Sequence, residues 1–199
     1  MSSHYALAET TRQPSQVGKR TFAGNDIFVT LPLSQASNPP SNSTVEIRRA
    51  DILSPAAQHL IRCLNSELES RYPEEGANFF RLEPDEVREG HGGFFIAYAD
   101  GHPVACGAIR RIESAEAEIK RMYVAPSHRG QGVGGKILAK LEAEALRLGI
   151  RRIVLETGPR QPEAIAIYKR AGFFEIPLFG EYVDPRYSLC MAKNVASAR

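Results

Sequence analysis

A cluster of glycines in the sequence GQGVGG, residues 130 to 135, has the composition of a loop that binds phosphate groups. Arg129 precedes the cluster and Lys136 follows it, so positive charge stands on both sides. Because glycine has no side chain, the backbone of such a loop can approach an anion closely, and a helix that begins there points its N–H groups at the anion. The cluster therefore predicts an anion-binding site, although glycines before a helix also form simple tight turns.

The cluster satisfies the G-x-G-x-x-G pattern of dinucleotide-binding folds, and Glu156 ends the next predicted strand, where such folds carry an acidic ribose ligand. The context argues against this interpretation. The preceding strand, residues 117 to 124, alternates in polarity, and the five residues APSHR separate it from the first glycine. About 40 residues follow Glu156, which is too few for the remaining strands of a dinucleotide domain.

The spacing of Gly130, Gly135 and Lys136 also approaches a Walker A loop. Ile137 occupies the position at which that motif needs a hydroxyl group to bind magnesium, so a nucleoside triphosphate would lack its metal anchor. The third pattern is R-x-x-G-x-G, from Arg129 to Gly134. It fits a diphosphate held between a strand and the first turn of a long helix, and we favour it over the other two.

Hydrophobic periodicity predicts which elements position this loop. Residues 92 to 112 contain two strand-like runs around the turn pair Asp100 and Gly101, and so predict an antiparallel hairpin. The other predicted elements are strands at residues 44 to 49, 117 to 124, 151 to 158, 173 to 176 and 186 to 193, and helices at residues 54 to about 70, 133 to 148 and 162 to 172. Their order, β-α-β-β-β-α-β-α-β-β, predicts an α/β fold: a mixed sheet flanked by helices on both sides.

The chain length of 199 residues suits one domain, which we place at residues 45 to 193, with a flexible N-terminal tail at 1 to 44 and a C-terminal tail at 194 to 199. The first segment is poor in acidic residues and rich in serine and threonine, which also suits a transit peptide, but a tail is the simpler interpretation. Within it, the sequence NDIFVTLPL could form an additional strand.

The composition sets limits on location and partners. Lys and Arg number 25 and Asp and Glu 23, so the formal charge of +2 does not favour a nucleic-acid or membrane partner. The three cysteines have neither disulfide-framework nor zinc-site spacing, and no histidine pair has metal-ligand spacing, so we expect no metal. Neither a membrane-spanning apolar run nor a secretory signal is recognisable, and we expect a cytoplasmic protein.

Several motifs in a fixed order give the chain a family resemblance: a strand ending in MYV, then Pro126, the loop RGQGVG, an apolar helix, LETG and finally AIAIYKRAGF. Over residues 45 to 193 the chain resembles the Gcn5-related N-acetyltransferases. The resemblance implies acetyl-coenzyme A as co-substrate, with its pyrophosphate on the glycine-rich loop and its pantetheine arm along the strand. The implied coenzyme A contacts are Met122, Tyr123, Val124, Arg129, Gly130, Gln131, Gly132, Val133, Gly134, Gly135 and Lys136.

The same resemblance implies catalytic roles. Glu118 lies eleven residues before Arg129, where the histone acetyltransferase branch carries a general-base glutamate, although a glutamate beginning a strand is usually a solvated surface residue. Tyr168 lies five residues before Phe173, where the family carries a tyrosine that protonates the coenzyme A thiolate; packing against the sheet is the alternative. A backbone amide between Met122 and Val124 would polarise the thioester carbonyl.

The acceptor is less well specified by the sequence. Glu156 and Thr157 either line the acceptor site or only terminate their strand. In the family, specificity lies in segments that correspond to residues 67 to 86 and 177 to 188, which here mix carboxylates with arginines. We therefore predict N-acetylation of a small zwitterionic or cationic amine. A protein or peptide acetyltransferase and a non-catalytic acyl-coenzyme A sensor remain alternatives, and the family resemblance also allows a homodimer.

Overall fold

The computed structural model describes residues 44 to 74 and 81 to 195, all of which belong to one compact unit, Ser41–Arg199. The predicted N-terminal tail, with its candidate strand, lies outside the described residues except for residue 44. The final strand extends to Asn194, one residue beyond the predicted end of the domain.

The centre of the unit is a seven-stranded sheet with the strand order β1-β2-β3-β4-β5-β7-β6. The pairs β1–β2, β2–β3 and β3–β4 are antiparallel, the pair β4–β5 is parallel, and the pairs β5–β7 and β7–β6 are antiparallel. This confirms the predicted mixed sheet and the predicted order of elements. The strands are β1 (Glu46–Arg49), β2 (Gly92–Ala99), β3 (His102–Arg111), β4 (Glu116–Val124), β5 (Arg152–Thr157), β6 (Phe174–Glu175) and β7 (Leu189–Asn194).

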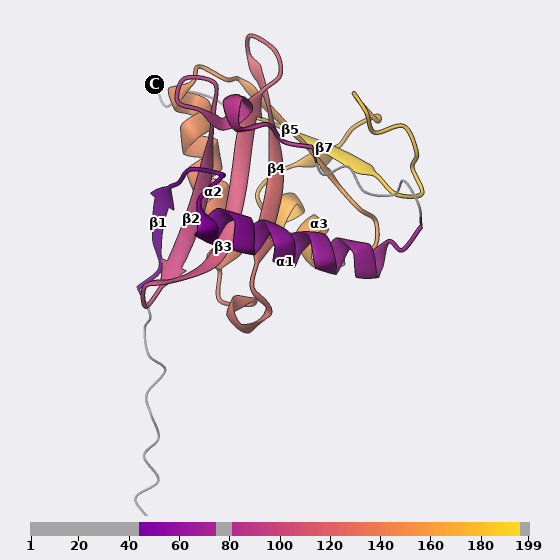
Figure 1. The fold of residues 1–199 in the computed structure, drawn as a ribbon. Coiled ribbons are helices and arrows are strands. Elements are labelled where there is room, and N and C mark those ends of the chain that lie inside the picture. Colours follow the sequence, from indigo (N-terminus) through magenta and orange to yellow (C-terminus); the bar gives the residue numbers. More distant parts are fainter. Residues whose placement is uncertain (1–43, 75–80, 196–199) are drawn as a thin grey trace, which may run out of the picture. The chain divides into compact units, whose positions relative to one another are not determined.

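Helices cover both faces of the sheet (Figure 1). The helix α1 (Pro55–Arg71) and the short 3-10 helix η1 (Pro84–Val87) pack on one face, which we call the α1 face. The helices α2 (Val133–Arg147) and α3 (Pro162–Arg170) pack on the other, which we call the α2 face. A second 3-10 helix, η2 (Pro126–His128), joins β4 to the glycine-rich loop.

The local signals in the sequence account for the ends of these elements. Ser54 caps α1 by accepting a hydrogen bond from the N–H of Ala57, and Pro55 occupies the first helical position, as predicted. The hairpin turns at Asp100 and Gly101, which both have the positive φ of a tight two-residue turn. Each sheet face buries an apolar cluster because successive side chains of a strand point to opposite faces.

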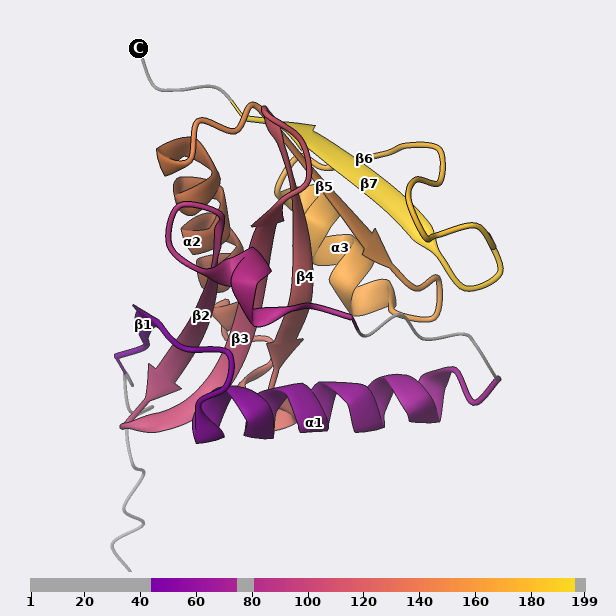
Figure 2. The same cartoon turned by 45° about the horizontal axis from the view of Figure 1, so that its top comes forward.

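The parallel pair β4 and β5 separates part-way along its length. Its hydrogen-bonded register covers only Glu116 to Ile119 on β4 and Arg152 to Leu155 on β5. Beyond these residues β4 continues to Val124 and stays paired with β3, while β5 stays paired with β7 as far as Thr157. Figure 2 shows the two strands diverging toward the end at which α1 crosses the sheet. The sheet is therefore open between β4 and β5.

Candidate active site

The glycine-rich loop has the backbone conformation that the sequence predicts. Gly130 and Gly132 have φ angles of 74° and 78°, which residues with a side chain adopt at a cost, and Gly132 is the residue immediately before α2. The first backbone hydrogen bond of α2 runs from the N–H of Lys136 to the carbonyl of Gly132, at 3.1 Å. The N–H groups that precede Lys136 are thus directed out of the helix end, where an anion is stabilised by them and by the helix dipole.

A cavity of about 930 Å³ leads from this loop to the opening between β4 and β5. Nine of the predicted coenzyme A contacts line it: Met122, Tyr123, Val124, Arg129, Gly130, Gly132, Val133, Gly134 and Gly135. The side chains of Gln131 and Lys136 do not. Gln131 instead donates a hydrogen bond to the carbonyl of Ser127, at 3.0 Å, and Lys136 is exposed on the first turn of α2.

A β-bulge in β4 shapes the wall of this cavity. The register with β3 shifts between Cys106 and Ala108, so that Gly107 faces two residues of β4, and Arg121 takes a φ of 60°. A Cβ atom on Gly107 would lie 2.7 Å from a methyl carbon of Ile137 and 2.9 Å from the sulfur of Met122. The glycine therefore allows α2 and the bulged strand to pack this closely.

Tyr168 lines the cavity from α3 and is 5% exposed. Its ring packs against Phe173, with the ring centroids 5.8 Å apart. Burial, reinforced by the nearby charge of Glu156, raises the pKa of Tyr168 above its ordinary value. The phenol therefore keeps its proton throughout the neutral pH range, as a proton donor must. The packing alternative considered for this residue also holds, since the same side chain is part of the core.

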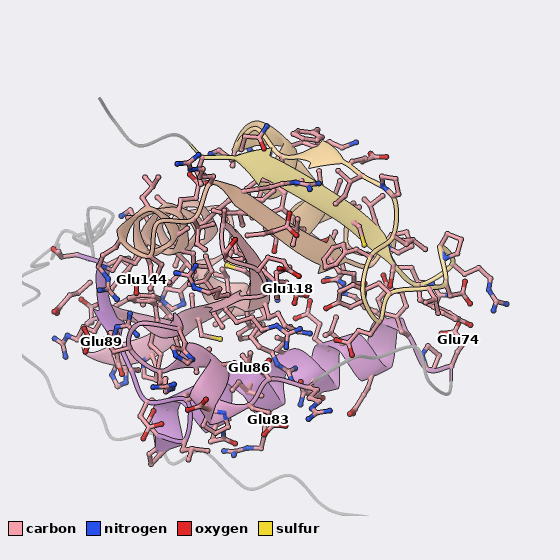
Figure 3. All side chains as sticks on the ribbon, turned by 90° about the horizontal axis from the view of Figure 1, so that it is seen from above. Glu74, Glu83, Glu86, Glu89, Glu118 and Glu144 are labelled. Carbon is pink, nitrogen blue, oxygen red and sulfur yellow. The ribbon has the colours of Figure 1, made fainter. Side chains whose placement is uncertain are left out.

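Glu118 lies in different surroundings from those that a general base requires. Its side chain is 1% exposed and is absent from the residues that line the cavity. Arg110 pairs with Oε2 at 2.7 Å, and the hydroxyl of Tyr182 donates to Oε1 at 2.5 Å. Lys120 lies 3.7 Å away. Figure 3 shows Glu118 near the centre of the molecule, with Glu86, the second carboxylate held by Arg110, close to it.

These contacts occupy both oxygens of the Glu118 carboxylate with donors that stabilise its charge. The carboxylate is thus engaged by these donors and does not line the cavity in which an acceptor amine would bind. The base role of Glu118 stays a prediction that these surroundings do not favour. The alternative of a solvated surface residue is wrong, because the side chain is buried.

Glu156 and Thr157 both line the cavity, at the end of β5. Glu156 is partly exposed there and accepts a hydrogen bond from Ser188. Gly158 follows directly and lies against the ring of Tyr72, whose hydroxyl accepts a hydrogen bond from the N–H of Arg160 at 2.7 Å. The cavity thus ends in a polar pocket formed by the end of β5 and the end of α1.

Comparisons with known proteins agree with this geometry. The model of the acetyltransferase (GNAT) family matches residues 57–173. The chain belongs to this family. It is therefore an acetyl-coenzyme A-dependent N-acetyltransferase. A relative from Azospirillum brasilense, called IAA acetyltransferase, is 36% identical over 154 residues, which cover 75% of this chain and 97% of that protein.

Solved structures show the same GNAT fold. A crystal structure from Klebsiella pneumoniae, of a protein considered an acyl-CoA N-acyltransferase, has 31% identity and a TM-score of 0.66, and the match covers 77% of this chain and 99% of that one. A GNAT acetyltransferase from Elizabethkingia anophelis, crystallised with acetyl-CoA bound, has a TM-score of 0.54 at 16% identity, with 76% and 98% covered. At that identity the second structure supports the fold alone.

The residues of this GNAT chain fit acetyl-coenzyme A. The glycine-rich loop offers N–H groups for a pyrophosphate, and the cavity continues along the unpaired edge of β4 to Tyr168 and Glu156. When bound, acetyl-coenzyme A supplies an acetyl group activated as a thioester. Within residues 44 to 74 and 81 to 195, no group of three or more His, Cys, Asp or Glu side chains could hold a metal ion, and no helix is long and apolar enough to cross a membrane.

The sequence did not reveal a chain of ion pairs among residues that line the cavity. Arg129 of the glycine-rich loop binds Glu67 of α1 at 2.5 Å, Glu67 also binds Arg71 at 2.8 Å, and Arg71 binds Glu163 of α3 at 2.6 Å. The spacing of Glu67 and Arg71 by four residues signals a pair within one helix. The two longer links join elements far apart in the sequence, and only folding brings them together.

Proposed function

We propose that the protein transfers the acetyl group of acetyl-coenzyme A to the primary amine of a small molecule, with Tyr168 as the general acid for the departing thiolate. The observation that carries this proposal is the continuous cavity that joins the glycine-rich loop to Tyr168 and to the polar pocket at the end of β5. One cavity would thus hold the acetyl donor and the acceptor amine together, with a proton donor in its wall.

Contacts at the acceptor end favour a small molecule over a protein. Arg160 pairs with Glu74 at 2.6 Å and donates to the carbonyl of Arg71 at 2.8 Å, and its backbone N–H donates to the Tyr72 hydroxyl. These bonds tie the end of α1 to the start of α3 beside the cavity, where a peptide acceptor would need a long open groove. The relative called IAA acetyltransferase, which is named for a small-molecule acceptor, supports the same class.

The proposal is tested by mixing the protein with acetyl-coenzyme A and a panel of acceptors and measuring the release of free thiol. The panel contains amino acids, polyamines, amino sugars, the compound abbreviated IAA and a lysine peptide. We expect thiol release that depends on a small amine, and a loss of about 10²–10⁴-fold in Tyr168→Phe, since the variant lacks the proton donor. Release with the lysine peptide alone would contradict the small-molecule assignment.

A control separates catalysis from binding. Acetyl-coenzyme A should raise the melting temperature of the wild type and of Tyr168→Phe by similar amounts, because the glycine-rich loop is intact in both. If Tyr168→Phe abolishes this stabilisation as well, the loss of activity reflects a damaged core, and the acid role of Tyr168 is contradicted.

A further inference from the structure

The pleat of the sheet fixes the direction in which Glu156 projects. Ile153 and Leu155 of β5 belong to the apolar cluster under α2 and α3. Because side chains alternate along a strand, Glu156 projects to the opposite, α1 face. On β4, Ile119 packs under α2, so Lys120 also projects to the α1 face, across the opening from Glu156. The register between β4 and β5 has ended at this point, so the pair borders the opening rather than a closed ladder.

Tyr168 reaches the same cavity from the other face of the sheet. Its helix, α3, packs with α2, and its ring belongs to the cluster on the α2 face. Glu156 and Tyr168 therefore line one cavity from opposite sides of the opening between β4 and β5. A reacting group placed in this opening would have a carboxylate on one side and a phenol on the other.

We propose that Glu156 is the general base of the acetyl transfer and takes the proton from the acceptor ammonium on the α1 face. The proposal rests on the proposed function, since it requires an amine acceptor in this cavity. Glu156 fits the role better than Glu118 does. Glu156 lines the cavity and, among the described residues, forms no ion pair. Glu118 does not line the cavity and is held by Arg110 and Tyr182.

The groups around Glu156 set the pKa of its carboxyl group. Burial raises the pKa of Glu156 to about 7, which the hydrogen bond from Ser188 and the charge of Lys120 partly oppose. A carboxylate with a pKa near the working pH is well matched to general-base catalysis. The titratable or charged groups that act on it from the surrounding elements are Tyr72, Glu118, Lys120, Tyr168, Glu181, Tyr182 and Cys190.

The protons balance with these two residues. An ammonium group loses two protons on becoming an amide, and the departing thiolate gains one. Glu156 accepts the first proton and passes it to solvent. The freed amine forms the carbon–nitrogen bond as the carbon–sulfur bond breaks, and Tyr168 donates its hydroxyl proton to the sulfur. The second proton of the nitrogen restores the Tyr168 hydroxyl, so one proton is released overall.

The test compares Glu156→Gln, Glu156→Asp and Glu118→Gln with Glu113→Gln, a control at an exposed turn position. With the best amine of the panel, kcat/KM of the wild type should rise with pH, with a midpoint near pH 7, and level off above it. In Glu156→Gln, kcat/KM should fall by about 10²–10⁴-fold and should no longer rise with pH. Acetyl-coenzyme A should still raise the melting temperature of this variant. Glu156→Asp should keep the rise at a reduced rate, and Glu118→Gln should keep the rise as well.

A second measurement needs no acetyl-coenzyme A. In the free protein labelled with ¹³C at glutamate carboxyl carbons, one signal should titrate near pH 7 and be missing from Glu156→Gln. If an amine is acetylated and Glu156→Gln retains the wild-type rate and pH profile, the base role of Glu156 is overturned. Loss of the rise in Glu118→Gln alone would assign that role to Glu118. If acetyl-coenzyme A binds but no amine is acetylated at any pH, the proposed function fails, and the role of Glu156 fails with it.

Discussion

Replacing Glu156 by glutamine should make the folded protein more resistant to unfolding at alkaline pH. The folded state raises the pKa of Glu156 from an ordinary 4.5 to about 7, chiefly by burial. A raised carboxyl pKa gives a stabilising contribution that is fully present below pH 4.5 and is lost as the pH rises through 7. Above pH 7 the wild type therefore holds a charged carboxylate in a poorly solvated place, whereas glutamine carries no charge at any pH.

The magnitude follows from the pKa difference. One pH unit corresponds to about 1.4 kcal/mol, so the interval from 4.5 to about 7 corresponds to an upper limit of roughly 3.5 kcal/mol. In a domain of this size each kcal/mol moves the melting temperature by about 2–4 °C. The melting temperature of Glu156→Gln, relative to that of the wild type, should therefore rise by up to about 7–14 °C between pH 4.5 and pH 8.5.

Urea and thermal unfolding at a series of pH values between 4.5 and 8.5 would measure this change. The chain contains no tryptophan, so circular dichroism is a better probe than fluorescence. Glu113→Gln removes a carboxylate from an exposed turn and should show the same pH dependence as the wild type. A constant difference between Glu156→Gln and the wild type across this range would refute the reasoning, because the folded state would then not penalise the charged carboxylate.

Three further predictions concern the framework of the site. Glu118→Ala should lower the free energy of unfolding by about 1–3 kcal/mol, measured by urea denaturation, because Arg110 and Tyr182 lose a buried acceptor, although Arg110 keeps Glu86; no measurable loss would contradict the described network. Gly132→Ala should lower the free energy of unfolding by about 1–2 kcal/mol and weaken coenzyme A binding measured by calorimetry, because Gly132 has a φ of 78°. Gly135→Ala should not lower the free energy of unfolding, because the added carbon meets open space. Equal destabilisation by both substitutions would count against the positive φ of Gly132. Gly158→Ala places a carbon 1.9 Å from the Tyr72 hydroxyl oxygen and should lower the melting temperature. Adding Tyr72→Phe removes that oxygen and should recover part of the lost melting temperature. If nothing is recovered, the clash does not involve the Tyr72 hydroxyl.

The sequence alone predicted the order of the elements and the location of the glycine-rich loop. Both depend on signals between near neighbours: the helical periodicity from Val133 onward, the turn pair at Asp100 and Gly101, and the glycines before α2. Such signals act within a few residues, so they can be recognised in the sequence without knowledge of the fold. The loop and most of its predicted contacts lie along the cavity for the same reason.

Only the tertiary structure decided which of the two carboxylates, Glu118 or Glu156, faces the cavity and which forms a buried ion pair. Glu118 and Glu156 are both acidic residues on predicted strands, and nothing near either one in sequence distinguishes a buried ion pair from a group that faces a cavity. The difference arises because Arg110 and Tyr182 converge on Glu118, while the β4–β5 ladder ends just before Glu156. Arg110 and Tyr182 lie 8 and 64 residues from Glu118 in the sequence. Packing of the whole sheet brings these partners together and sets the point at which β4 and β5 separate.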